Sequence, residues 1–323
     1  MSTGILGAAG YLPPRVIDND QVGAWVDRDP DWILERTGIK ERHYAAPEVS
    51  TSDMACLAVE KLYASCPEKR ASVGAVILGT STPDHNFPST AAIVQGRMGL
   101  GRAFAFDLSA ACSGYLFSFV TAHSLLSANP ALEEVLVIGA DTISKVLYQS
   151  DRKTVTVFGD GAAATRVGRV PDGYGLLTHT LITDGCHADY VGQPAGGSRR
   201  PLDATTVNAR ERYMVMHGRK VREYFEEVVP KLIHEVVEQA GVSLDDIDHF
   251  VFHQANPQML ADCINAMGID PAKCPVPGVL SGNTGAASIP LVLSELRAER
   301  GDLVVMAAIG SGMTAGAAVL RWY

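Results

Sequence analysis

The chain of 323 residues lacks several features that would assign its function at once. Its six cysteines form no CxxC pair, which argues against a zinc site and against a disulfide-stapled secreted scaffold. No stretch reaches the roughly 18 consecutive apolar residues that a membrane span needs, and the start, MSTGILGAAGYLPP, shows no basic segment followed by an apolar run. The formal charge of −9 disfavours non-specific contact with nucleic acid or anionic lipid. These absences predict a protein of the reducing cytoplasm.

The apolar residues are numerous enough to build a large core, since they make up 47% of the chain. Short β-rich runs alternate with helical stretches, as is typical of an α/β fold with buried strands. The clearest strands are expected at 75–80, 135–141 and 303–310. The longest helix is expected to start near Gly218, where apolar residues recur at helical spacing.

The order of elements repeats weakly along the chain. The first half reads VGAVILGT, TAAIVQGRMGL, AFAFDL, SAACSGYLFSFV, VLVIGAD and TVTVFGDGAAATRVG as strand, helix, strand, helix, strand and strand. The same order is expected from IDHFVFHQ, MLADCINAMGI, CPVPGVL, SGNTGAASIPLVLSEL, LVVMAAIG and MTAGAAVLRWY. Two similar α/β halves are predicted, residues 1–170 and 171–323. Residues 184–212 are expected to form a long surface loop of the kind that often lines a site.

Three polar residues lie where predicted strands end or helices begin. Cys112 precedes an apolar helix, whose N-terminus is expected to favour the thiolate, the form that attacks a thioester. A cysteine of a cytosolic protein is, however, more often a small buried residue. His253 follows a buried strand and Asn283 precedes a helix, at positions where α/β sheets bind ligands. A structural histidine and a helix-capping asparagine are equally open interpretations.

Six sequence blocks give these residues a shared context: DWILERTGIKERHYAAP, AACSG, SDRKTVTVFGDGAAA, HQAN, GNTGAASIP and GSGMTAGAAVLRWY. In this order the chain resembles the type III 3-oxoacyl-[acyl-carrier-protein] synthases of the thiolase superfamily. The resemblance covers nearly the whole chain and implies a five-layer thiolase fold and a homodimer. It also implies that Phe87 closes the acyl pocket across the dimer interface, although plain core packing is the alternative for this residue.

The resemblance implies a decarboxylative Claisen condensation that runs by a ping-pong mechanism. Cys112 would accept an acyl group from coenzyme A or a carrier protein, and His253 and Asn283 would act on a malonyl-type donor. The backbone N–H groups of Cys112 and Ser311 would form the oxyanion hole. Coenzyme A thioesters enter as substrates, and no metal or other cofactor is implied.

The same resemblance suggests how coenzyme A binds. Trp32 and Arg152 look like the pair that sandwiches the adenine, a role that suits an indole face and a planar guanidinium. Arg36 resembles a contact to the phosphates, and Gly218 and Asn256 resemble groups of the pantetheine tunnel. For Trp32, core packing is the alternative.

The chain departs from the family pattern around the expected tunnel mouth. Basic residues that dock an acidic carrier protein are replaced at four positions: Glu223, Gln258, Asn265 and Ala266. Loss of these charges is expected to weaken the attraction of an anionic carrier. Arg219 and Arg222 stand where a neutral polar residue and an aromatic are usual, either as solvated charges or as a new contact to a carrier or an anionic acyl substrate.

Two other classes of function stay open at this stage. One is an acyltransferase that passes the Cys112 acyl group to a hydroxyl or amine, with His253 as general base. The other is a catalytically idle binding subunit, which the presence of Cys112, His253 and Asn283 disfavours. The sequence leaves undecided the acyl chain and whether the second substrate is carried by coenzyme A or by a protein.

Overall fold

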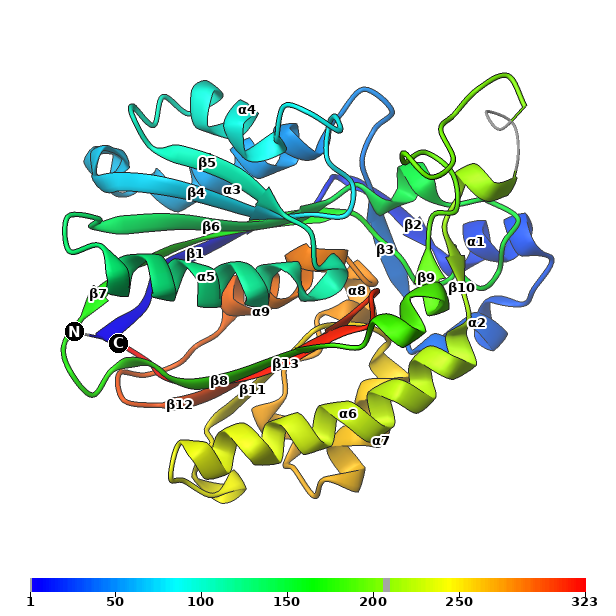
Figure 1. The fold of residues 1–323 in the computed structure, drawn as a ribbon. Coiled ribbons are helices and arrows are strands. Elements are labelled where there is room, and N and C mark those ends of the chain that lie inside the picture. Colours follow the sequence, from blue (N-terminus) through cyan, green and yellow to red (C-terminus); the bar gives the residue numbers. More distant parts are fainter. Residues whose placement is uncertain (1, 206–209) are drawn as a thin grey trace.

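The computed structural model describes residues 2–205 and 210–323, and two β-sheets form its centre (Figure 1). The first sheet has the order β1-β7-β6-β4-β5. Its strands are β1 (Ser2–Tyr11), β4 (Val73–Gly79), β5 (Phe104–Leu108), β6 (Glu134–Asp141) and β7 (Gly161–Val170). The second sheet, with the order β11-β12-β13-β8, consists of β8 (Gly175–Thr183), β11 (His249–Phe252), β12 (Leu303–Gly310) and β13 (Thr314–Arg321). The strands expected at 75–80, 135–141 and 303–310 are confirmed as β4, β6 and β12.

The two sheets are layered with helices (Figure 1). Helices α5 (Gly114–Ala128) and α9 (Ser288–Glu295) lie between the sheets, and α3 (Thr51–Tyr63) and α4 (Thr90–Arg97) cover the outer face of the first. Helices α6 (Gly218–Gln239) and α7 (Pro257–Ala266) cover the outer face of the second. The result is the predicted five-layer arrangement. The long helix begins at Gly218, as its apolar spacing predicts.

Smaller elements complete the chain beside these layers. They are β2 (Arg15–Asp18), α1 (Asn19–Val26), α2 (Pro30–Thr37), β3 (Glu41–Tyr44), β9 (Val191–Gly192), β10 (Val215–Met216) and α8 (Gly278–Ser281). None of the helices among the described residues is long and apolar enough to cross a membrane.

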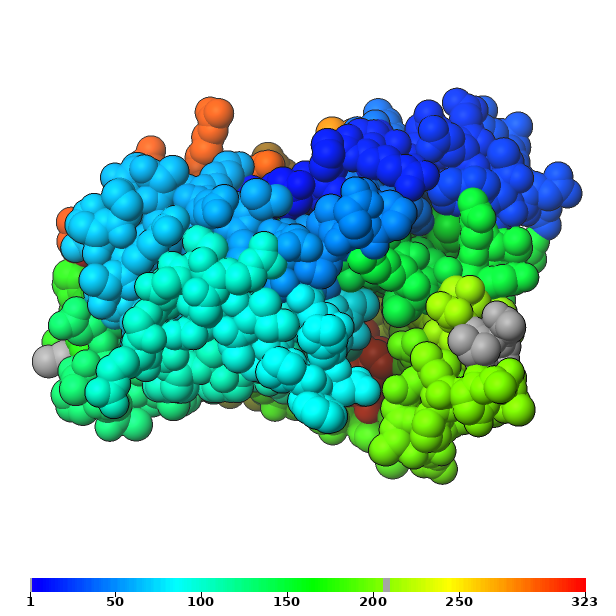
Figure 2. All heavy atoms as spheres, turned by 90° about the horizontal axis from the view of Figure 1, so that it is seen from above, coloured from blue at the N-terminus to red at the C-terminus, as the bar shows by residue number. Residues whose placement is uncertain are grey.

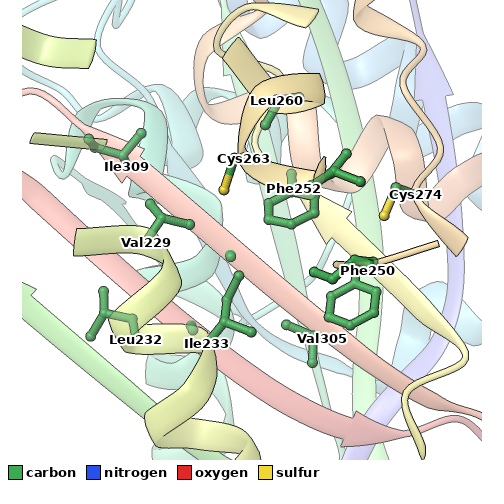
Figure 3. Close-up of a cluster of buried hydrophobic side chains, with 14 of the residues drawn as sticks. Val229, Leu232, Ile233, Phe250, Phe252, Leu260, Cys263, Cys274, Val305 and Ile309 are labelled. Carbon is green, nitrogen blue, oxygen red and sulfur yellow. The ribbon is translucent and has the colours of Figure 1, made fainter. Parts of the chain in front are cut away.

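The core under the second sheet shows how α6 is held (Figure 3). The apolar stripe of α6 packs on β12 and β13 and on α7, in a cluster that also contains side chains of β11. The labelled members of this cluster are Val229, Leu232, Ile233, Phe250, Phe252, Leu260, Cys263, Cys274, Val305 and Ile309. A single buried stripe is what an outer-layer helix needs, whereas α5, between two sheets, buries residues on most of its surface. Ile309 also lines the cavity described below, so this core supports the site directly.

One expected strand is absent, and another begins later than expected. The segment CPVPGVL contains no strand, because Pro275 and Pro277 have no N–H to donate to a sheet, and α8 forms instead at its end. The strand expected from TVTVFGDGAAATRVG begins only at Gly161. The N–H groups of residues 154 and 155 instead donate to the backbone oxygen of Asp151 and close a turn. The Asp151 carboxylate also accepts from the N–H of Lys153, at 3.1 Å.

The second half therefore matches the first less closely than its apolar runs suggest. The proposed division near residue 170 falls in the turn between β7 and β8 and stays a prediction. The loop expected at 184–212 contains a short 3-10 turn at Gly185–Tyr190 and the strand β9, and residues 206–209 lie outside the described part of the chain.

Candidate active site

A cavity of about 1260 Å³ lies where the two sheets meet the loops that follow them. The first half of the chain contributes the wall that contains residues 108–112, and the second half contributes His253, Ala255, Asn256 and residues 309–314. Figure 2 shows a hollow in the surface, with atoms of the C-terminal part of the chain visible at its bottom. Cys112, His253, Asn283 and Ser311 all line this cavity, so the structure brings the four predicted residues of the reaction centre together.

Cys112 lies in a tight turn between β5 and α5. Ala111, the residue before it, has a φ of 48°, an uncommon conformation for a residue other than glycine. The turn is tied to the second sheet, because the hydroxyl of Thr314 donates to the Ala110 oxygen at 3.0 Å and that of Ser113 donates to the Thr314 oxygen at 3.3 Å. Cys112 is thus held half-buried at the cavity surface.

The ionisation of Cys112 differs from the sequence-based expectation. Burial and the nearby charge of Asp141 raise the pKa of the Cys112 thiol to about 12. A backbone N–H group lowers this pKa, in the direction expected for a helix N-terminus, but the loss of solvent around the thiol has the larger effect. At neutral pH the site holds a thiol.

The turn of residues 310–312 packs directly against the nucleophile candidate. A side chain at Gly310 would bring a Cβ to 2.9 Å from the Cys112 nitrogen, so only glycine permits this approach. The hydroxyl of Ser311 donates to the Val191 oxygen, and Met313 exchanges two backbone hydrogen bonds with Asp184, at 2.7 and 2.9 Å. The backbone of Ser311 is therefore fixed beside that of Cys112.

His253 follows β11, and its backbone N–H donates to the Ala307 oxygen at 2.8 Å. Its ring nitrogen Nδ1 lies 2.8 Å from the Ser288 hydroxyl. The residue is 2% exposed, and burial lowers its pKa to about 3. The imidazole is therefore neutral at physiological pH.

Asn283 is fixed through both its backbone and its amide. The backbone exchanges hydrogen bonds with residues 157–159, since its N–H donates to the Val157 oxygen and its oxygen accepts from Gly159, both at 2.9 Å. Its Oδ1 accepts from the Gly285 N–H at 2.9 Å, and its Nδ2 donates to the Ala255 oxygen at 3.3 Å. A backbone N–H can only donate, so the amide orientation is determined. One Nδ2–H remains for a ligand in the cavity that Asn283 lines.

Asp141, at the end of β6, joins the two walls of the site and was missed by the sequence reasoning. Its Oδ1 accepts from the hydroxyl and N–H groups of residues 80–82, and its Oδ2 accepts from the Ala286 N–H at 2.8 Å. A Cβ at Gly285 would lie 2.3 Å from Oδ2. The sequence signal was an aspartate that ends the buried run VLVIGAD.

The residues expected to bind coenzyme A gather at the mouth of the cavity. Trp32, Arg36, Arg152, Gly218 and Asn256 all line it. The guanidinium of Arg36 lies 5.5 Å from the centre of the Trp32 ring, whereas Arg152 shares only the lining of the cavity with Trp32. The sandwich of the adenine by Trp32 and Arg152 stays a prediction. Asn256 caps α7 by accepting from the Met259 N–H at 3.0 Å, and its amide donates to the Arg36 oxygen at 3.4 Å.

Phe87 lies outside the cavity lining and is 87% exposed. It belongs to the loop between β4 and α4. Its predicted role requires a second copy of the chain and stays a prediction.

The altered positions on α6 and α7 form a surface at the cavity mouth in which basic and acidic side chains pair. Arg222 lies 2.6 Å from Glu226 and 2.7 Å from Asp262, and Arg219 lies 3.6 Å from Glu223. Gln258 donates to Asp262 at 3.1 Å, and Asn265 and Ala266 are exposed at the end of α7. Arg219 and Arg222 also line the cavity.

Comparison with known proteins places these features in a family context. Residues 106–185 match the model described as 3-oxoacyl-[acyl-carrier-protein] synthase III, and residues 237–322 match the model of its C-terminal part. The chain is 39% identical to the β-ketoacyl-[acyl-carrier-protein] synthase III of Solibacter usitatus, over 97% of this chain and 96% of that one. It is 40% identical to the acetoacetyl-CoA synthase NphT7 of Streptomyces sp. strain CL190, over 98% of both chains.

The fold agrees with this relationship. The solved structure of the β-ketoacyl-[acyl-carrier-protein] synthase III of Thermus thermophilus superposes with a TM-score of 0.92 at 39% identity, covering 99% of both chains.

Proposed function

The chain belongs to the 3-oxoacyl-[acyl-carrier-protein] synthase III family and is an acyl-thioester condensing enzyme, and we propose that Cys112 carries the acyl group while His253 and Asn283 act on the malonyl-type donor. The overall class is that of an acyltransferase. The observation that carries the assignment is the fixed amide of Asn283, which leaves one N–H for a ligand in the cavity that Cys112 also lines.

In the first half-reaction, the Cys112 sulfur attacks the thioester carbon of an acyl-coenzyme A. The new carbon–sulfur bond replaces the bond to coenzyme A, and the proton that Cys112 loses is the one that the departing thiol gains. The exchange therefore needs no net acid or base, which suits a thiol whose pKa is raised to about 12. The backbone N–H groups of Cys112 and Ser311 are the proposed donors to the tetrahedral oxyanion.

In the second half-reaction, a malonyl thioester loses carbon dioxide and the electron pair of the broken bond moves onto its thioester oxygen. N–H donors placed at this oxygen stabilise the enolate. The enolate carbon then attacks the acyl carbon on Cys112, the carbon–sulfur bond breaks, and the sulfur takes a proton from solvent. The products are a 3-oxoacyl thioester and a free Cys112 thiol.

The competing function is acyl transfer to a hydroxyl or amine with His253 as general base. A general base works best when its pKa lies near the working pH. Burial lowers the pKa of His253 to about 3, which makes the imidazole a poor base and favours its use as a neutral hydrogen-bond donor.

Coenzyme A is the proposed carrier of the second substrate as well as the first. The mouth residues that replace basic ones are acidic or neutral, and Arg222 is already paired with Glu226 and Asp262. Such a surface attracts an anionic carrier protein weakly. The relative from Streptomyces, named as an acetoacetyl-CoA synthase, supports a coenzyme A-linked product.

The proposal includes a cytoplasmic homodimer. The six cysteines of each chain form no CxxC pair, and this spacing supports a reducing compartment. The strand β5 forms an edge of the first sheet, and its Phe104 is exposed like Phe87. An unpaired edge strand beside exposed aromatic side chains is suited to pairing with a second copy.

The proposal is tested by offering the enzyme a panel of acyl-coenzyme A thioesters and then malonyl-coenzyme A or a malonyl carrier protein. Intact mass should show one acyl group on Cys112, and malonyl-coenzyme A should then yield one carbon dioxide and one 3-oxoacyl-coenzyme A per acyl group consumed. Ester or amide formation from added alcohols or amines without carbon dioxide would instead support the competing function.

A further inference from the structure

The hydroxyl of Ser288, at the start of α9, lies between two groups of the segment that carries His253. Its Oγ is 2.8 Å from the backbone nitrogen of Gln254 and 2.8 Å from Nδ1 of His253. A backbone N–H can only donate, so the Ser288 oxygen accepts from Gln254. The hydroxyl hydrogen is left for a different partner.

The position of this hydrogen follows from the burial of Ser288, which is 1% exposed. If Nδ1 of His253 carried the ring proton, Ser288 would accept twice, and its hydroxyl hydrogen would have no acceptor among residues 2–205 and 210–323. If Nδ1 carries no proton, the hydroxyl donates to it and every group has a partner. Buried polar groups in folded proteins are nearly always paired, so the second arrangement is favoured.

The consequence concerns the other ring nitrogen of His253. A neutral imidazole carries its single proton on one nitrogen, so a bare Nδ1 requires a protonated Nε2. Nδ1 is used by Ser288, and His253 lines the cavity, so Nε2 is the nitrogen available to a ligand there. The Ser288 hydroxyl thus selects the tautomer that offers a donor to the cavity.

We propose that Ser288 is a positioning residue that holds His253 as its Nε2–H tautomer, so that His253 donates a hydrogen bond to the malonyl thioester oxygen beside the Nδ2–H of Asn283. The inference rests on the proposed condensing function for its consequence, but the tautomer itself does not depend on that function. Ser288 touches neither substrate in this scheme and acts through the ring of His253.

The tautomer is measured directly by ¹⁵N NMR of the full-length protein with labelled histidine. Long-range proton–nitrogen correlations distinguish a protonated Nε2 from a protonated Nδ1, and the His253 signals among the nine histidines are assigned by their loss in His253→Gln. The wild-type protein should show the Nε2–H pattern. Ser288→Ala should shift the pattern toward a mixture, and Ser288→Thr, which keeps the hydroxyl, should restore it.

The kinetic arm compares acyl-adduct formation on Cys112 with carbon dioxide release from malonyl-coenzyme A. Loss of a whole oxyanion donor lowers kcat by about 10²–10³. Ser288→Ala, which loses part of this contribution, should slow decarboxylation by about tenfold or more. The rate of acyl-adduct formation should stay within about twofold of wild type, because the first half-reaction does not use His253 in this scheme.

Ser281→Ala is the matched control, because Ser281 is also buried and its hydroxyl donates to the oxygens of Pro277 and Gly282 without touching His253. It should leave both the tautomer and the decarboxylation rate unchanged. Thermal melting of each variant separates a folding defect from a change at His253.

The outcomes distinguish the inference from the function on which it rests. An Nδ1–H pattern in the wild-type protein, or a Ser288→Ala variant with unchanged tautomer and decarboxylation rate, overturns the role of Ser288 even if condensation proceeds. A wild-type protein with the Nε2–H pattern but no acyl adduct or carbon dioxide release would instead overturn the condensing assignment and leave the tautomer assignment standing.

Discussion

At the floor of the cavity, His253 and Asn283 are 2% and 4% exposed, and hydrogen bonds hold both side chains. At the mouth, the Arg219 side chain is 90% exposed and lies 3.6 Å from its acidic partner Glu223. The floor therefore presents donors whose positions are set before a substrate arrives. The mouth presents charges that solvent screens and that can be exchanged with little effect on folding. This difference explains how a chain can keep the residues of the family reaction while the surface that selects the carrier changes.

Among substitutions at the floor and the mouth of the cavity, Cys112→Ser should cause the largest loss of condensing activity. Loss of the nucleophilic sulfur should remove the acyl adduct and lower condensation by roughly 10³-fold or more, as is typical when a covalent nucleophile is replaced. Intact mass after incubation with acyl-coenzyme A provides the measurement. Cys186→Ser is the control, since Cys186 is exposed and lies outside the cavity lining. An adduct of undiminished yield in Cys112→Ser would move the nucleophile elsewhere.

Asn283→Asp should have the next largest effect. The substitution replaces an N–H donor at the floor with a negative charge, so decarboxylation should fall by about 10²–10³ while the acyl adduct still forms. Carbon dioxide release from malonyl-coenzyme A measures the loss. Asn129→Asp adds the same charge to an exposed turn and should behave like wild type. Equal loss of adduct formation and decarboxylation would mean that Asn283 serves the first half-reaction too.

The alkylation of Cys112 by iodoacetamide should reveal its buried setting. A thiolate is the reactive form, and the pKa of Cys112 is raised to about 12, so its alkylation rate should keep rising between about pH 7 and 10. An ordinary thiol with a pKa of about 8.5 levels off in this range. Peptide mass spectrometry follows Cys112 at each pH. A plateau below about pH 8 would instead show a stabilised thiolate, as the helix N-terminus alone suggests.

The smallest effect is expected from Glu223→Lys at the mouth. Reversing this exposed charge should raise kcat/KM for a malonyl carrier protein by a few-fold, because exposed charge pairs contribute about 0.2–1 kcal/mol. The rate with malonyl-coenzyme A should change less, and the gain should shrink at high salt. Glu238→Lys, an exposed residue further along α6, is the control. An equal gain in Glu238→Lys would make the effect one of net charge rather than of the mouth.

The arrangement of the fold was predictable where local pattern and tertiary structure agree. Buried strands such as β12 and the amphipathic helix α6 follow from apolar spacing, and the order of motifs was enough to bring Cys112, His253 and Asn283 to one cavity. The expected strand at CPVPGVL failed because its prolines lack N–H groups, a constraint that the apolar pattern hides.

The electrostatics of the site were not predictable in this way. The charge that raises the pKa of Cys112 comes from Asp141, which belongs to another strand, and the burial of the thiol depends on the whole cavity wall. Ser288 was missed because it lies 35 residues from His253 in the sequence and no local pattern links the two. Their contact exists only in the folded chain.

The most direct test of the central claim uses enzyme that carries a labelled acyl group on Cys112 before malonyl-coenzyme A is added. In wild type, the acyl group should leave Cys112 as 3-oxoacyl-coenzyme A in step with carbon dioxide release. In His253→Ala, which removes a donor from the floor without touching Cys112, the acyl group should load normally and then persist with carbon dioxide release slowed by about 10²-fold or more. Consumption of the acyl group at the wild-type rate in His253→Ala would contradict the account.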